Sequence, residues 1–149
     1  MKMKKQIVVT HWIKEKPRLG SFLKLTLSSD ERRILRGKRI TDCDKEIILQ
    51  LPRDGKLNDG DILSTNKSNF YVEIIAKTED LIEISSNSKI ELIKTAYHLG
   101  NTHVEVEIQE NILLTKGDYV IESMLKNFNV DIVNTQKKFF PEQGAHSHE

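Results

Sequence analysis

The chain has only one cysteine among its 149 residues, Cys43, and this scarcity removes several classes of site at once. An intrachain disulfide and a cysteine-based zinc cluster both need at least two thiols, so neither can form. Cys43 also lies between Asp42 and Asp44, an acidic setting that does not activate a thiol for nucleophilic attack. We therefore expect Cys43 to have no catalytic role.

Long apolar runs and enzyme motifs are missing as well. No apolar stretch approaches the roughly 20 residues needed to cross a bilayer. The basic start, residues 1–5, is not followed by the apolar segment and small-residue cleavage site of a signal peptide. There is no glycine-rich phosphate loop and no recognisable Ser/His/Asp constellation. We predict a cytoplasmic protein without membrane contact, which is not an enzyme and has no catalytic residues.

Charge of one sign is also lacking overall, since the net charge is +1, but the two halves differ. Residues 1–80 contain 17 Lys/Arg against 12 Asp/Glu, and residues 81–149 contain 6 against 10. The split favours two units with different partners. The strongest basic cluster has no aromatic residues around it, which argues against nucleic acid and for a solvated surface or an acidic protein partner. Its members are Arg32, Arg33, Arg36, Lys38 and Arg39.

The first half of the sequence contains short strand-like segments separated by turn signals, with no helical period. These segments predict a small all-β domain over residues 1–77. The predicted strands include Phe22–Leu27, Arg32–Arg36, Lys38–Thr41, Glu46–Leu51 and Phe70–Ala76.

The second half changes to alternating strands and helices. A helix is predicted from a Ser88 cap to Gly100, which would be its left-handed stop, and a second helix from an Asp118 cap. The expected buried stripes are Ile90, Ile93, Ala96 and Tyr97 on the first helix, and Ile121, Met124, Leu125 and Phe128 on the second. The predicted strands are Leu81–Ser85, His103–Ile108, Ile112–Leu114 and Val130–Val133.

This order of strand, helix, strand, strand, helix, strand predicts a ferredoxin-like βαββαβ domain over residues 78–141. Residues 142–149 are polar and are expected to form a flexible tail that contains histidine. The fold class expected for the whole chain is therefore α+β.

The histidines are the candidates for chemistry. His98 would lie in the last turn of the first helix, where an imidazole can cap free carbonyls. His103 would begin the next strand, and because Val104 and Val106 face the helices, His103 would point to the open face of the sheet. The same sequence pattern would also be found for an ordinary exposed histidine that binds no metal. A metal site would form if a two-fold axis paired His103 with its copy and His146 and His148 closed over the ion. Imidazole nitrogen suits nickel, copper or zinc.

Three segments together resemble one family. Residues 97–103 read Tyr-His-Leu-Gly-Asn-Thr-His, which resembles the Y-H-L-G-N-R-H signature of the urease accessory protein UreE family. Upstream, residues 46–53 and 57–63 are similar to the family's L-P-R-G and L-x-x-G-D-x-L segments. Downstream, residues 140–145 resemble its F-x-P-E-x-G-A run before a histidine-bearing tail. The resemblance extends over nearly the whole chain.

The resemblance implies a homodimeric nickel chaperone that delivers Ni²⁺ for assembly of the urease active site, in a complex with the GTPase UreG. It implies an N-terminal "peptide-binding" domain and a C-terminal metal-binding and dimerisation domain. It also implies that His103 is the ligand shared by the two subunits, with His146 and His148 as auxiliary ligands for Ni²⁺, or for Zn²⁺ or Cu²⁺ at the same site. Thr102 departs from the family's usual Arg, and residues 116–119 lack the histidine pair that some members have there.

One alternative remains at the level of the sequence. The chain could be an interaction module that binds protein or nucleic acid without metal, with a ferredoxin-like domain that only dimerises. We favour the metal chaperone, with partners that include no membrane and no nucleic acid.

Overall fold

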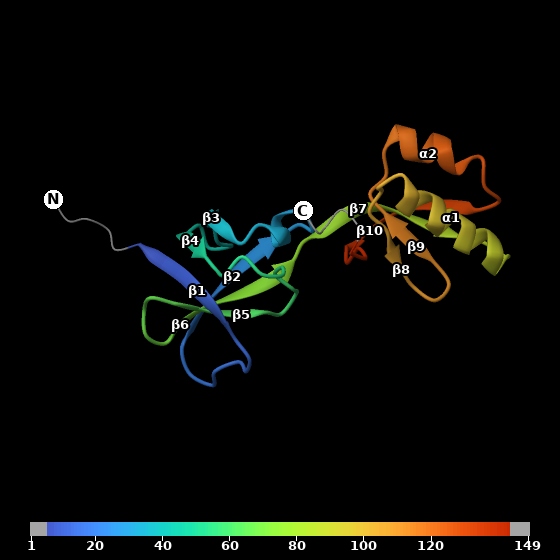
Figure 1. Ribbon diagram of the computed structural model, residues 1–149. Helices are drawn as coiled ribbons and strands as arrows, with labels where there is room; N and C mark the ends of the chain where they lie inside the picture. Colours follow the sequence, from blue (N-terminus) through green and yellow to red (C-terminus); the bar gives the residue numbers. More distant parts are fainter. Residues whose placement is uncertain (1–5, 144–149) are drawn as a thin grey trace. The chain divides into compact units, whose positions relative to one another are not determined.

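The computed structural model describes residues 6–143 and confirms an α+β architecture with two sheets (Figure 1). The chain divides into two compact units, Met1–Lys77 and Thr78–Glu149, and both α-helices of the described residues belong to the second. None of these helices is long and apolar enough to cross a membrane.

The first unit is built on one six-stranded sheet in the order β2-β6-β5-β1-β4-β3. The pairs β1–β4 and β2–β6 are parallel, and the other three pairs are antiparallel. Alternate leucines of β2, beginning at Leu23, are buried because successive strand residues face opposite sides. The strands are β1 (Ile7–Ile13), β2 (Ser21–Leu27), β3 (Arg36–Ile40), β4 (Glu46–Gln50), β5 (Ile62–Thr65) and β6 (Phe70–Ala76).

The predicted strand over residues 32–36 is wrong, because the chain turns there. Residues Glu31–Arg33 form a short 3₁₀ helix, η1. The Ser28 N–H donates to the Glu31 carboxylate at 2.9 Å, and the Glu31 N–H donates to the Ser28 hydroxyl at 3.2 Å. This reciprocal pair has the hydrogen bonds of a capping box, a Ser-x-x-Glu signal that the strand prediction did not take into account. The turn buries Arg32, which therefore does not belong to the exposed basic surface.

The second unit contains β7 (Thr78–Ser85), α1 (Lys89–Asn101), β8 (Glu107–Ile108), β9 (Leu113–Thr115), α2 (Tyr119–Leu125) and β10 (Asp131–Lys138). The four strands form an antiparallel sheet in the order β10-β7-β9-β8. Both helices pack through one hydrophobic cluster onto the sheet face that carries Ile82 and Ile84 (Figure 1). Leu81, Leu114 and Phe139 form a separate buried cluster.

Helix α1 buries mainly the opposite face from the one predicted, and of the predicted stripe only Ala96 packs against the core. Leu92, Thr95 and Leu99 are buried, and the hydroxyl of the fully buried Thr95 is satisfied because it donates to the Glu91 carbonyl at 2.7 Å. Ile93 and Tyr97, expected in the core, are 62% and 75% exposed, and Ile90 is 56% exposed. Residues at spacings of three, four and seven share one helix face, so α1 has two apolar stripes on opposite sides. Periodicity alone could not tell which of them was the core.

The helix caps agree better with expectation. The Ser88 side chain accepts from the Glu91 N–H at 3.4 Å, and the Asp118 side chain accepts from the Ile121 N–H at 2.8 Å. In the second stripe, Leu125 is buried, while Ile121 and Met124 pack at the edge of the cluster.

Candidate metal centre

His103 lies in a tight turn that ends α1. Its φ is +62°, in the left-handed region, and the cap residue is Thr102. The Val104 N–H donates to the Leu99 carbonyl at 2.9 Å, and the His103 N–H donates to the Gly100 carbonyl at 3.0 Å. These two bonds define a Schellman motif, in which the left-handed residue is usually glycine. The predicted stop at Gly100 is therefore wrong, because the left-handed residue is His103.

The predicted strand from residue 103 is also wrong in its extent. β8 comprises only Glu107 and Ile108. Val104 and Val106 pack on the helix-covered core as expected, but the order is reversed within β8, where Glu107 is buried and Ile108 is 51% exposed. His103 is exposed, as expected, but it is held at the end of a helix and not on the open face of the sheet. The Schellman turn satisfies backbone groups that a strand starting at residue 103 would have used.

The role expected of His98 is filled by its neighbour. The Thr102 hydroxyl lies 3.1 Å from the His98 carbonyl and 3.0 Å from the Leu99 carbonyl, and it caps the end of the helix. The half-buried imidazole of His98 packs against the ring of Phe128, with ring centroids 5.2 Å apart. Thr102 therefore has a structural function at the position where the family signature has arginine.

The C-terminal segment is hydrogen-bonded to the start of β8 and to the residue before it, a connection that the sequence did not reveal. The Phe140 N–H donates to the Glu107 carboxylate at 2.8 Å, and the Gln109 side-chain amide donates to the same carboxylate at 2.6 Å. Two residues further on, the Glu142 N–H donates to the Val106 carbonyl at 2.8 Å. Glu107 is 9% exposed, so a buried carboxylate fixes the origin of the tail.

The described residues alone do not form a metal site. Within residues 6–143, no group of three or more His, Cys, Asp or Glu side chains is placed to hold one ion. The predicted ligands His146 and His148 lie outside the described residues. Of the predicted ligands, the structure therefore shows only the position of His103.

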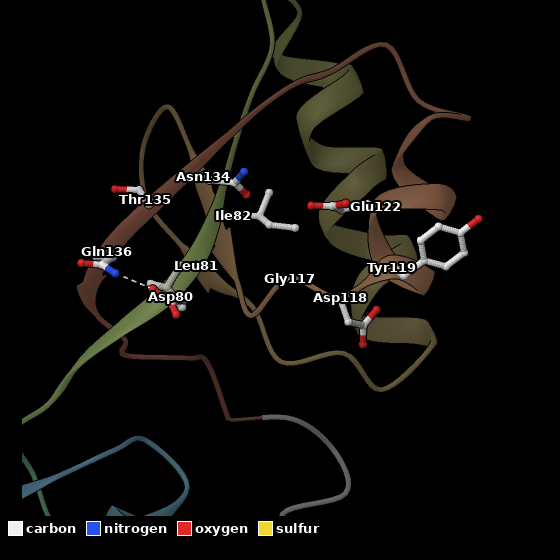
Figure 2. Close-up of a pocket in the computed structure, with 10 residues that line it drawn as sticks. All are labelled: Asp80, Leu81, Ile82, Gly117, Asp118, Tyr119, Glu122, Asn134, Thr135 and Gln136. Atoms are coloured by element: carbon white, nitrogen blue, oxygen red, sulfur yellow. Dashed lines mark hydrogen bonds between the residues drawn. The ribbon is translucent and has the colours of Figure 1, made fainter.

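A pocket of about 660 Å³ lies elsewhere in the second unit, between the β7–β10 pair and the start of α2 (Figure 2). It includes the stretch where some family members have a histidine pair, but its polar lining is of carboxylates, amides and hydroxyls. The Asp80 carboxylate is already bound by the Gln136 amide at 2.7 Å. Gly117 is required here because any larger residue would collide with Ile82. Without imidazole in its lining, this pocket lacks the nitrogen donors that nickel or copper favours.

Comparison with known proteins agrees with the resemblance in the signature. Residues 79–149 match the family model described as UreE urease accessory protein, C-terminal domain. The chain is 87% identical over its whole length to all of a protein named urease accessory protein UreE from Prochlorococcus marinus strain MIT 9312. A protein of the same name from Prochlorococcus marinus subsp. pastoris strain CCMP1986 is 62% identical to it, in an alignment that covers the whole chain and 97% of that protein. Another protein of that name, from Parasynechococcus marenigrum, is 43% identical to it, in an alignment that covers 84% of the chain and 83% of that protein. The chain therefore belongs to the urease accessory protein UreE family, and is an accessory protein and not an enzyme.

Proposed function

We propose that the protein is a homodimeric, nickel-binding metallochaperone of the cytoplasm, which delivers Ni²⁺ for assembly of the urease active site. The observation that carries the proposal is the position of His103: an exposed residue in a hydrogen-bonded turn at the end of α1, a helix that also carries an apolar stripe exposed to solvent. A fixed imidazole beside a surface able to bind a second copy is half of a two-fold metal site.

The exposed stripe of α1 supplies the dimer surface. Ile90, Ile93 and Tyr97 share one face of the helix, which ends at the turn that holds His103. Three large apolar side chains, each more than half exposed, lose favourable burial energy when they face water. Packing of this stripe against the same stripe of a second subunit would bury all six side chains. It would also bring the two His103 side chains towards one axis.

The anchored C-terminal segment supports a role for the tail histidines. An extended chain covers at most about 3.6 Å per residue, so the four and six residues that separate Glu142 from His146 and His148 in the sequence can span at most about 14 Å and 22 Å. By the same limit, His103 lies within about 11 Å of Val106, to which Glu142 is bound. The tail therefore starts close enough for either histidine to reach an ion held at His103.

The arrangement suits delivery better than storage. Two imidazoles from folded turns would capture the ion, and ligands on a tail could enter and leave its coordination shell without unfolding a domain. Zinc or copper would fit the same donors. Transfer to the GTPase UreG would then need only an exchange of ligands.

We also propose the domain roles that go with this function. The strand order β10-β7-β9-β8, with both helices on one face, supports a ferredoxin-like metal-binding and dimerisation domain over residues 78–141. The six-stranded unit of residues 1–77 would be a peptide-binding domain, and residues 142–149 a tail with metal ligands.

Calorimetry of nickel binding tests the site. We expect wild-type protein to bind one ion per two chains tightly, and His103→Ala to weaken binding at least tenfold. His11→Ala is a matched control, since it removes another exposed imidazole, from β1. Unchanged tight binding in His103→Ala would refute the assignment, and an equal loss in the control would point to nonspecific imidazole binding.

The dimer is tested separately. Analytical ultracentrifugation should give a dimer for wild type and a monomer for a variant with Ile93→Asp and Tyr97→Asp. Val120→Asp, a single change at a 72% exposed position of α2, is the control expected to remain dimeric. A stripe variant that stays dimeric would show that the interface lies elsewhere. Nickel-dependent copurification with UreG, lost in His103→Ala, would then test delivery.

A further inference from the structure

Among the described residues, the outer edge of β3 pairs with no other strand. The Leu51 N–H donates to the Leu35 carbonyl, and the Thr41 N–H donates to the Lys45 carbonyl, which fixes the hydrogen-bonding phase of the β3–β4 ladder. In an antiparallel pair, hydrogen-bonded and non-hydrogen-bonded positions alternate. Gly37 and Arg39 therefore bond to β4, whereas residues 36, 38 and 40 direct their N–H groups away from the sheet.

The edge at the other end of the sheet order is different. On β2, the Asp42 N–H donates to the Lys24 carbonyl at 2.8 Å, and the Thr26 N–H donates to the Asp42 carboxylate at 3.2 Å. Asp42 of the same chain is therefore already hydrogen-bonded to the outward-facing backbone groups of β2 at these two positions. Among the described residues, β3 is hydrogen-bonded as a strand only to β4, and it presents the accessible edge.

Arg39 gives this edge a specific chemistry. One terminal nitrogen of its guanidinium donates to the Lys38 carbonyl at 2.7 Å, which is one of the edge groups. Its Nε is shielded from solvent and has no hydrogen-bond partner among the described residues. Gly37 leaves room for the side chain to lie along the strand, since a Cβ there would be 3.1 Å from the guanidinium. An unsatisfied buried donor is costly, and a carboxylate could satisfy two guanidinium N–H groups at once.

The surroundings favour an acidic strand with some apolar residues. Arg36 and Lys38 are exposed on β3, and Arg33 is exposed in η1 just before it. The ion pair of Lys38 with Glu46 at 3.3 Å is itself exposed to solvent. Ile34 and Ile40, at the two ends, are 51% and 55% exposed. A strand that added to β3 would find cations beside its middle residues and apolar side chains at its ends.

We propose that the outer edge of β3 binds an extended acidic segment of a partner protein by strand addition, with Arg39 moving from the Lys38 carbonyl to a carboxylate of that segment. The released carbonyl would then accept an N–H from the added strand. The inference rests on the peptide-binding role proposed for residues 1–77 and identifies its site and ligand class. It involves no metal ligand, so it can fail while nickel binding succeeds.

The test uses the full chain and a pool of fluorescein-labelled nine-residue peptides, with glutamate at every second position and Val, Ile, Thr or Phe at the others. We expect the pool to bind in fluorescence anisotropy and to slow amide hydrogen exchange at residues 36, 38 and 40. Exchange at residues 37 and 39, which are already bonded to β4, should change little. Arg39→Gln should weaken binding about tenfold, the usual effect of losing a charged hydrogen bond.

The controls separate strand addition from general attraction. Arg18→Gln removes an exposed cation in the β1–β2 loop and should change binding less than about twofold, because exposed charges contribute little. If Arg39→Gln folds poorly, Lys38→Gln is used in its place for the binding measurement. The alternating amide protection along β3 is measured in the wild-type protein in either case.

Several results would overturn the proposal. They are absence of binding at 1 mM peptide, protection that does not alternate along β3, and equal binding of a pool with lysine in place of glutamate. Tighter binding of an oligothymidylate of the same charge would instead assign the surface to nucleic acid.

Discussion

Replacing His103 by glycine should stabilise the protein in the absence of metal while weakening nickel binding. His103 has a φ of +62°, and a left-handed conformation costs an L-residue about 1–2 kcal/mol, a cost that glycine avoids. Glycine loses more backbone entropy on folding, which offsets roughly 0.5–1 kcal/mol of that gain. The expected net stabilisation is about 0.5–1 kcal/mol, which for a domain of this size corresponds to a rise in Tm of about 2–8 °C.

The assay is thermal unfolding of metal-free protein followed by circular dichroism, with nickel calorimetry on the same samples. His103→Asn is the matched variant, because asparagine tolerates the left-handed region but provides no imidazole, so it should lose nickel affinity with little change in Tm. A lower Tm for His103→Gly would refute the reasoning, because it would show that contacts of the His103 side chain outweigh the backbone cost. A higher Tm with unchanged nickel affinity would leave the strain argument intact but remove His103 from the site.

Three further predictions follow from the geometry of the second unit. Glu107→Gln removes the charge that accepts the Phe140 N–H at 2.8 Å, and should weaken the attachment of the C-terminal segment by about 1–2 kcal/mol. The expected signs are faster proteolytic cleavage near residue 140 and faster nickel release. Unchanged rates of both would exclude an anchoring role for Glu107. Gly117→Ala forces a collision with Ile82 and should destabilise the unit by about 1–3 kcal/mol in urea unfolding, whereas Gly100→Ala, with open space around it, should not. Nickel affinity should fall by about 10- to 100-fold per pH unit in acid, because protons compete for one or two imidazoles; a flat profile in calorimetry between pH 7 and 5 would argue for carboxylate ligands.

The sequence predicted the secondary structure well wherever a local signal was unambiguous. Caps at Ser88 and Asp118 form as expected, because each side chain accepts from the N–H three residues later. The strand over residues 46–50 also forms where its apolar run predicted it. The turn at residues 31–33 had an equally clear Ser-x-x-Glu signal, and the strand predicted there was wrong because the cap was overlooked.

The candidate site was predicted in identity but not in backbone geometry. Glycine is the residue expected in the left-handed position that ends a helix, so the end of α1 was predicted at Gly100, three positions before the left-handed residue His103. A histidine in that conformation has no propensity signal in the sequence, so the strand was extended back to residue 103. The bond from Glu142 to Val106 was likewise invisible, because nothing local in either segment indicates a partner 36 positions away.

Helix α1 has two apolar stripes, and the one that was wrongly predicted to be buried bears on the proposed function. A helix that served only the core would need one stripe, and Leu92, Thr95 and Leu99 already provide it. A second stripe with Ile93 and Tyr97 facing water lowers solubility and contributes nothing to the core of its own unit. Such a pattern is consistent with a helix that has a partner on each side. The proposed dimer supplies the second partner, and the same surface would then place His103 near its copy.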